Sequence, residues 1–274
     1  MPQIAYYYSG YLDMIKAGSV KSGASINVCV PTGNFGNILA AWYARAIGTP
    51  IGQLYCASNE NHVLTDFINS GTYDISSRPF SITPSPSMDI LVSSNLERQL
   101  FELNGRNPEL IRQWMQDLAT KQSFQVDKTT FSTLRESFSA DWVDSNDSLA
   151  VIREVFEQHH YLLDPHTAVA WRVAERLRPS ADTPVLITAT AHWAKFPEDV
   201  YRALNGLPVE AALPSEVAEL SGSELIGLLS EQTGVYDIPK HLAELDSKSI
   251  RFNQQSDSTP EALKQSVRNW LSQQ

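Results

Sequence analysis

The stretch Val28-Cys29-Val30-Pro31-Thr32-Gly33-Asn34-Phe35-Gly36-Asn37-Ile38-Leu39-Ala40 decides the fold of this chain. A short β-branched run is interrupted by two glycines and two asparagines, and a helical pattern follows. Glycines let backbone N–H groups turn toward a ligand, and the first turn of a helix adds unpaired N–H groups and the positive end of its dipole. The stretch therefore predicts a strand, an anion-binding loop and a helix. The alternative is a plain strand-to-helix turn that needs Gly33 and Gly36 only for its geometry.

The glycine spacing separates this loop from two other phosphate-binding loops. A dinucleotide fingerprint requires G-x-G-x-x-G and an acidic residue about 20 positions later, whereas only G-x-x-G is present here, although Glu60 follows the next predicted strand. A P-loop requires Lys and then Ser or Thr after its last glycine, but Asn37 follows Gly36. The spacing favours a cup for a single phosphate on a small cofactor, and a nucleotide site that uses Glu60 is a minor alternative.

Strand and helix patterns alternate around this loop. We predict strands near 26–30, 53–57 and 184–190, and one short strand at 124–126 within a polar, helical stretch over about 105–145 that resembles an insertion. This alternation predicts an α/β fold with a parallel sheet whose ligands bind at the carboxyl ends of the strands. Predicted helices lie over 2–17, 35–47, 59–70, 87–103, 147–160, 165–178 and 197–205, with a last one introduced by the capping-box pattern Ser258-Thr-Pro-Glu261.

Six motifs in register carry a family resemblance. They are Pro31-Thr-Gly-Asn-Phe-Gly-Asn-Ile38, Cys56-Ala-Ser-Asn-Glu-Asn61, Ser85-Pro-Ser-Met-Asp-Ile-Leu91, Ser93-Ser-Asn-Leu-Glu-Arg98, Asp164-Pro-His-Thr-Ala-Val169, and Thr190-Ala-His192 with Ala194-Lys-Phe196. Together they resemble threonine synthase, a pyridoxal-phosphate enzyme of the tryptophan-synthase-β-like group. The resemblance runs from Met1 to about residue 205 and is thinner beyond.

The resemblance implies a partial, three-layer parallel sheet of a fold type II pyridoxal-phosphate enzyme. Residues 1–205 would be the carboxyl-terminal part of its large cofactor-binding domain, and 206–274 a helical extension. By the same resemblance, the cofactor phosphate would be held by the loop and the pyridine nitrogen would meet a hydroxyl. These cofactor-binding residues are Gly33, Asn34, Phe35, Gly36, Asn37 and, for the hydroxyl, Thr190.

Further polar residues are candidates for the substrate side of the site. Donors near a helix start can bind a substrate phosphate, so we expect Ser85, Ser87 and Asn95 to line the pocket. His192 and Lys195 could in principle move protons or form an imine. In the family their segment shapes the pocket, and Trp193 replaces the proline usual there. We therefore expect no direct catalytic role for either, and we expect a structural role for His166.

The resemblance also shows what this sequence does not contain. The family's Schiff-base lysine lies well before the phosphate loop, in a Phe-Lys-Asp segment that is absent here. The lysines of this chain are at positions 16, 21, 121, 128, 195, 240, 248 and 264. Pyridoxal phosphate would then bind non-covalently at best, and we expect no catalytic residue and no turnover from this chain alone.

We therefore predict a threonine synthase-like chain whose complete form converts O-phospho-L-homoserine and water to L-threonine and phosphate, a carbon-oxygen lyase reaction of threonine biosynthesis. The alternative is a non-catalytic phosphate-binding or interaction module with the same fold. Because half a domain would leave a sheet edge exposed, the expected partners are a small phosphate ligand and either an amino-terminal fragment or a second copy.

Composition excludes several other functions. The net charge of −10 opposes binding to nucleic acid or anionic membranes. No apolar run reaches the roughly 18 to 20 residues of a membrane span, and no signal peptide is recognisable. Cys29 and Cys56 fall in predicted buried strands and fit a reducing cytoplasm, and His159-His160 lacks the spacing of a metal site.

Overall fold

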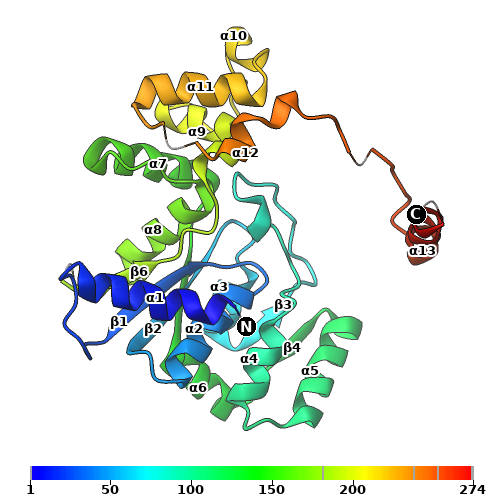
Figure 1. Ribbon diagram of the computed structural model, residues 1–274. Helices are drawn as coiled ribbons and strands as arrows, with labels where there is room; N and C mark the ends of the chain where they lie inside the picture. The colour runs from blue at the N-terminus through cyan, green and yellow to red at the C-terminus, as the bar shows by residue number, and fades with distance from the viewer. Residues whose placement is uncertain (1, 181, 237, 252, 273–274) are drawn as a thin grey trace.

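A four-stranded parallel sheet forms the centre of the computed structural model, which describes residues 2–180, 182–236, 238–251 and 253–272 (Figure 1). Its strands run in the order β5-β2-β1-β6. Val28 of β1 pairs with Leu54 of β2, and Leu54 pairs with Phe138 of β5. The predicted parallel sheet is therefore confirmed. The strands are β1 (Ile26–Pro31), β2 (Ile51–Ser58), β5 (Phe138–Trp142) and β6 (Val185–Ile187).

Helices cover both faces of this sheet, as alternating side chains require. Val28 and Val30 of β1 point into the core under α1 (Gln3–Lys16) and α2 (Gly36–Ala46). Cys29, between them, belongs to the second core, which α8 (Pro165–Leu177) covers. Both faces of a parallel strand are thus buried, and the architecture is the expected three layers. Cys29 and Cys56 are buried free thiols, and burial raises the pKa of Cys56 to about 12.

The stretch over 105–145 differs from its predicted role. It contains α5 (Pro108–Lys121), β4 (Ser123–Gln125) and α6 (Lys128–Ser137), as a helical insertion with one short strand would. It also contains β5, which the sequence analysis missed and which extends the main sheet beside β2. The end of this stretch is therefore part of the sheet itself. β4 pairs antiparallel with β3 (Thr72–Asp74) in a small second sheet.

Two predicted helices begin elsewhere than expected. Asn59 does not cap α3 (Val63–Ser70), because its side-chain oxygen accepts the N–H of Asn61. The predicted helix over 87–103 is only α4 (Leu96–Leu103), preceded by the short turn η1 (Pro86–Met88) and a loop. The predicted strand over 184–190 is confined to β6, so Thr190 lies three residues beyond the end of that strand.

The remaining helices follow the sheet in sequence. Figure 1 shows α9 and α11 above α7 and α12 to the side of α9, while α13 stands apart from the rest of the molecule. The cap of α13 is Thr259, whose hydroxyl accepts the N–H of Ala262, and not Ser258 as the capping-box pattern predicted. A reciprocal capping box is found instead at the start of α11, between Ser221 and Glu224. The bounds are α7 (Ser145–His159), η2 (Trp193–Lys195), α9 (Pro197–Leu204), α10 (Ser215–Ala218), α11 (Gly222–Thr233), α12 (Lys240–Ala243), η3 (Leu245–Ser247) and α13 (Pro260–Leu271).

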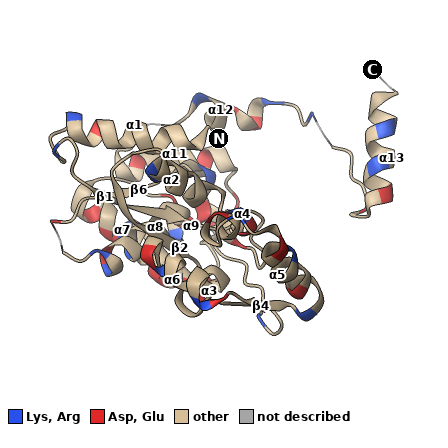
Figure 2. Cartoon of the chain, turned by 90° about the horizontal axis from the view of Figure 1, so that it is seen from below, with Lys and Arg blue, Asp and Glu red and all other residues tan. Residues whose placement is uncertain are grey.

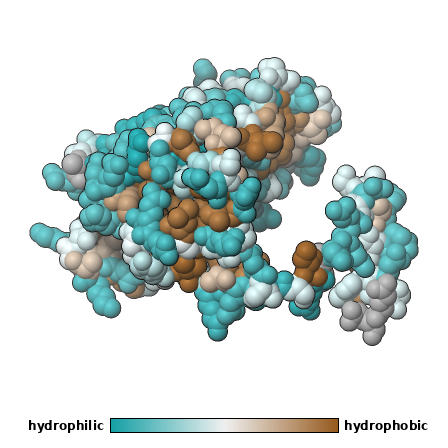
Figure 3. Space-filling model, turned by 90° about the horizontal axis from the view of Figure 1, so that it is seen from above, coloured by the Kyte–Doolittle hydropathy of each residue, from teal (hydrophilic) through white to brown (hydrophobic). Residues whose placement is uncertain are grey.

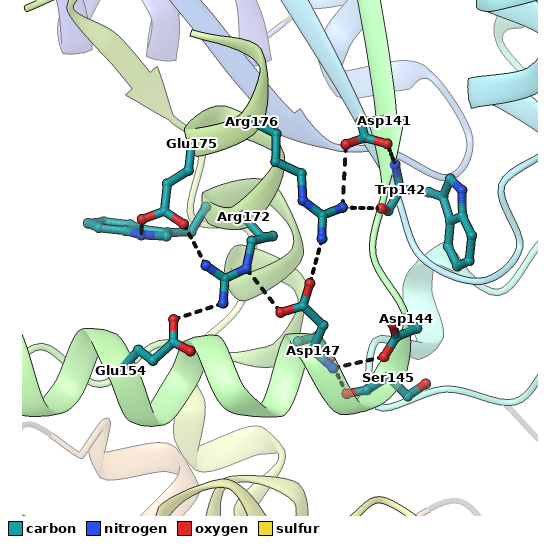
Figure 4. A network of polar contacts seen from close by, with 11 residues as sticks. Asp141, Trp142, Asp144, Ser145, Asp147, Glu154, Arg172, Glu175 and Arg176 are labelled. Atoms are coloured by element: carbon teal, nitrogen blue, oxygen red, sulfur yellow. Dashed lines mark hydrogen bonds and ion pairs between the residues drawn. The ribbon is translucent and has the colours of Figure 1, made fainter. Parts of the chain in front are cut away.

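Charged side chains fasten α7 to α8 (Figure 4). Arg172 of α8 donates to Asp147, Glu154 and Glu175, and Arg176 reaches both Asp147 and Asp141 at the end of β5. Two guanidinium groups therefore hold a helix pair and a sheet edge in one network. This network anchors the second half of α8, the helix whose N-terminal end carries part of the site.

The surface mixes charges and apolar side chains. Basic and acidic residues are interspersed along helices such as α5 (Figure 2), and Figure 3 shows hydrophobic groups among hydrophilic ones on the face seen from above. Among the described residues, no helix is both long and apolar enough to cross a membrane. Exposed large apolar side chains include Tyr6, Tyr8 and Leu12 on α1 and Leu263, Val267, Trp270 and Leu271 on α13.

Candidate functional site

The loop between β1 and α2 presents a row of free backbone donors. Within the described part of the chain, none of the consecutive N–H groups from Gly33 to Ile38 donates a hydrogen bond, and the helix ladder begins only where the Leu39 N–H donates to the Phe35 carbonyl. The first N–H groups of any helix lack a partner within the helix, and here the row of unpaired donors extends back to Gly33, an arrangement that is suited to binding an anion. We call this loop, residues 33–38, the phosphate cup.

The backbone of the cup requires a glycine at position 33. A methyl group on Gly33 would lie 2.8 Å from the Ser87 carbonyl oxygen and 3.1 Å from the Cα of Met88, and one on Gly36 would lie 3.3 Å from Nδ2 of Asn95. A side chain at Gly33 would therefore overlap the backbone of another segment, whereas one at Gly36 would crowd only the side chain of Asn95. Phe35, at the N-cap of α2, has a left-handed backbone with φ of 60°, and its buried ring packs beside Phe138.

A second segment, Ser93-Ser94-Asn95, also lies against the cup. Ser93 Oγ donates to the Gly33 carbonyl, and Asn95 donates to the Asn34 carbonyl from both its backbone N–H and its Nδ2. Ser94 Oγ donates to Asn34 Oδ1 at 3.0 Å. Because these bonds engage the carbonyl oxygens of the loop, its N–H groups stay available for a ligand.

Helix α1 also contacts the cup. The Tyr7 hydroxyl lies 2.7 Å from Oδ1 and 3.0 Å from the carbonyl oxygen of Asn37. Burial raises the pKa of Tyr7, so its hydroxyl remains a donor at neutral pH. The NH₂ group of Asn37 makes no hydrogen bond among the described residues, and it adds a further donor beside the backbone N–H groups.

A buried polar cluster shapes the loop over 81–90 that faces the cup. Asp89 accepts hydrogen bonds from Asn59, Asn61 and Thr83, and Asn59 also donates to Ser85 Oγ at 3.0 Å. Ser85 is 2% exposed, so its hydroxyl serves this cluster. Ser87 is exposed, and its side chain is the one of the two that can reach a ligand.

The start of α8 connects to the same loop through His166. Asp164 caps the helix, and its carboxylate accepts from the backbone N–H and Nδ1 of His166 and from the Thr167 hydroxyl. Burial acts to raise the pKa of Asp164, but these hydrogen bonds outweigh it and leave the pKa below its ordinary range. The carboxylate is therefore ionised, Nδ1 of His166 carries the proton, and Nε2 accepts the N–H of Ser87 at 3.3 Å.

The segment after β6 lies next to His166. The ring of Phe196 is 5.0 Å from the His166 ring, and Nδ1 of His192 accepts the Ala194 N–H within its own turn. Lys195 is exposed, with Nζ 5.8 Å from the centre of the Phe196 ring. His192 lines a hollow of about 280 Å³ together with Asp164 and Thr167.

The structure brings together most of the predicted residues. Gly33, Asn34, Gly36, Ser87 and Asn95 meet around the cup through the contacts described above. Thr190 is exposed and follows Ala189, which lines the His192 hollow. Glu60 accepts the Ser145 N–H at the start of α7, which explains its presence without a nucleotide. The sequence analysis missed Tyr7, Asn59 and Asp89. Asn59 and Asp89 lie within the quoted motifs, and the charge of Asp89 between the apolar Met88 and Ile90 was a usable signal.

Comparison with known proteins identifies the family. Residues 167–225 match the family model described as threonine synthase, C-terminal. The chain superposes on the crystal structure of threonine synthase from yeast with a TM-score of 0.78 and 30% sequence identity, over 99% of this chain and 52% of that one. The chain belongs to the threonine synthase family.

Other threonine synthase relatives agree. Human threonine synthase-like 1 is 43% identical over 225 residues, which are 82% of this chain and 29% of that protein. The pyridoxal phosphate-bound threonine synthase from Brucella melitensis has a TM-score of 0.70 and 36% identity over 85% of this chain and 50% of that one. The chain thus spans from under a third to about half of the length of these relatives. The predicted partial, fold type II sheet of a threonine synthase is confirmed.

Proposed function

We propose that this chain binds the phosphate group of pyridoxal phosphate in the cup over 33–38. The unpaired N–H groups from Gly33 to Ile38 carry this proposal, because they offer donors at a helix N-terminus with no acceptor of their own. The Brucella relative has pyridoxal phosphate bound, which supports the choice among phosphate ligands. Gly33 and Gly36 keep the backbone bare, and the free NH₂ of Asn37 adds a side-chain donor.

Together with an amino-terminal part that carries the Schiff-base lysine, the chain would act as a threonine synthase on O-phospho-L-homoserine and water. Pyridoxal phosphate, when bound, supplies an electron sink for the substrate carbons. The residues of this chain hold and orient: the cup binds the cofactor phosphate, Ser87 and Asn95 face the substrate side, and Thr190 would meet the pyridine nitrogen. Lys195, exposed beside Phe196, does not supply the missing lysine.

A titration with pyridoxal phosphate tests the binding step. We expect a non-covalent complex that inorganic phosphate displaces, with no adduct trapped by borohydride. Binding that phosphate leaves unchanged would contradict the cup as the site. A trapped adduct at Lys195 would contradict the role assigned to that side chain.

A complementation experiment tests the activity. The chain is mixed with an amino-terminal threonine synthase fragment that bears the lysine, and phosphate release from O-phospho-L-homoserine is measured. Each fragment alone is the control. Release from the mixture only supports the threonine synthase function. A folded mixed complex that binds the cofactor and releases no phosphate would instead favour a non-catalytic phosphate-binding module. The observation that favours this alternative is that the cup contains no lysine.

A further inference from the structure

Asp164 and His166 form a buried pair behind the loop that faces the phosphate cup. His166 is 2% exposed and Asp164 is 3% exposed, yet neither reaches the cup. The carboxylate of Asp164 receives the Nδ1 proton of His166 at 3.0 Å, which fixes both the ring orientation and the tautomer. Because Nδ1 donates its proton to Asp164, the other ring nitrogen, Nε2, is left as a hydrogen-bond acceptor with a fixed orientation.

That acceptor meets a backbone donor, the N–H of Ser87, at 3.3 Å. The Ser87 carbonyl, on the other side of the same residue, lies 2.8 Å from where a methyl group on Gly33 would be. Ser87 thus lies between His166, to which it is hydrogen-bonded, and the backbone of Gly33 in the cup. The Phe196 ring packs against the imidazole of His166, with 5.0 Å between the ring centres.

We propose that Asp164 and His166 are positioning residues that hold Ser87 against the phosphate cup and thereby set the affinity of the cup for its phosphate ligand. We call the hydrogen bond from the Ser87 N–H to Nε2 of His166 the latch. His166 acts through the single N–H of Ser87 and touches no ligand itself. The proposal rests on the proposed phosphate site, but the latch is measurable without any ligand.

Two substitutions separate the two nitrogen atoms of the imidazole. His166→Gln places an amide oxygen near the position of Nε2 and keeps an acceptor for Ser87. His166→Asn places its amide near Nδ1, so it keeps a donor for Asp164 and loses the acceptor for Ser87. Both remove the ring from its contact with Phe196, so a merely structural role would affect both alike.

The first measurement is amide hydrogen exchange at Ser87 in the ligand-free chain. We expect exchange at least tenfold faster in His166→Asn than in the wild type, and close to wild type in His166→Gln. The second measurement is the dissociation constant of pyridoxal phosphate, with displacement by inorganic phosphate as the check that the cup is the site. We expect this constant to rise about fivefold to tenfold in His166→Asn only, as the loss of one hydrogen bond predicts. Equal behaviour of the two variants in exchange would overturn the latch.

Ser87→Pro gives an independent test if substitutions of the buried His166 prevent folding. It deletes the N–H donor at an exposed residue and leaves His166 intact. We expect ligand binding to Ser87→Pro to weaken about fivefold to tenfold, and unchanged binding would contradict the proposal. Where His166→Asn does fold, we expect no further weakening in the double variant. Additive losses would contradict the proposal. If the wild type binds no pyridoxal phosphate, the proposed function fails, while the exchange at Ser87 still decides the latch.

Discussion

The ring of Phe35 lies 5.5 Å from the ring of Phe138, with 50° between their planes. Phe35 is the residue in the phosphate cup with a left-handed backbone, and Phe138 begins β5, more than a hundred residues later in the chain. A bulky residue in that conformation costs energy that surrounding contacts must offset. The buried ring contact between the two residues supplies such an offset and ties the shape of the cup to the edge of the sheet.

Truncation of this contact should destabilise the chain. We expect Phe35→Ala to lower the free energy of unfolding by about 3 to 5 kcal/mol, as for other fully buried Phe side chains. In a double-mutant cycle with Phe138→Ala, the coupling should be about 0.5 to 1.5 kcal/mol, measured by urea unfolding. Phe80→Ala is the control, because Phe80 is 55% exposed and should change little. Strict additivity would show that the two rings do not support each other.

A methyl group at Gly33 should damage both binding and stability. Gly33→Ala would set a Cβ 2.8 Å from the backbone oxygen of Ser87, which cannot rotate away. We expect a loss of about 1 to 3 kcal/mol in unfolding free energy from this overpacking. Binding of pyridoxal phosphate, followed by its absorbance, should weaken at least tenfold.

The matched control for this substitution is Gly227→Ala. Gly227 lies inside α11 with open space around its Cα, so alanine should stabilise the chain by roughly 0.5 to 1 kcal/mol and leave binding unchanged. If Gly33→Ala binds the cofactor as the wild type does, the close packing of Ser87 against Gly33 does not control binding in the cup.

The Arg172 network should contribute more than a surface ion pair. The Arg172 side chain is 19% exposed and serves three carboxylates, so Arg172→Ala should cost about 1 to 2 kcal/mol and leave Asp147 and Glu154 less well paired. Arg112→Ala is the control: the Arg112 side chain is 65% exposed and, within the described residues, pairs with Glu109 alone, so this substitution should cost less than about 0.5 kcal/mol. Thermal unfolding at low and high salt measures both. Equal losses for the two variants would count against the network.

The local parts of the fold were predictable from the sequence. The β1-cup-α2 unit depends on consecutive residues: a β-branched strand, two glycines and a helix start. The row of unpaired N–H groups, which we propose as a phosphate site, was predictable for the same reason, because these donors belong to neighbouring residues.

Contacts between distant residues were not predictable in this way. Strand β5 (Phe138–Trp142) was missed because only Phe138 and Ala140 face its core, while Ser139 and Asp141 are polar, and its pairing with β2 is not local. The amphipathic pattern over 87–103 predicts a helix, but Ser93 and Asn95 instead bond to the carbonyls of Gly33 and Asn34. The link from His166 to Ser87 spans 79 residues, and nothing in the sequence states it.

Asp164 should make the stability of the chain depend on pH in the acid range. Its pKa lies below its ordinary value of about 3.9, because hydrogen bonds from His166 and Thr167 outweigh the effect of burial. The stabilisation is therefore fully present above about pH 4 and is lost as pH falls through the lower pKa of the folded state. Relative to Asp164→Asn, whose amide can still cap α8, the wild type should be more stable at pH 6 by about 1 to 3 kcal/mol. The measurement is urea unfolding of both proteins between pH 6 and pH 3. The difference between their unfolding free energies should be constant down to about pH 4 and should shrink below it, because the effects of the other carboxylates are common to both proteins and cancel. A difference that stays constant to pH 3, or grows, would show that the carboxylate of Asp164 is not the group that His166 and Thr167 hold ionised.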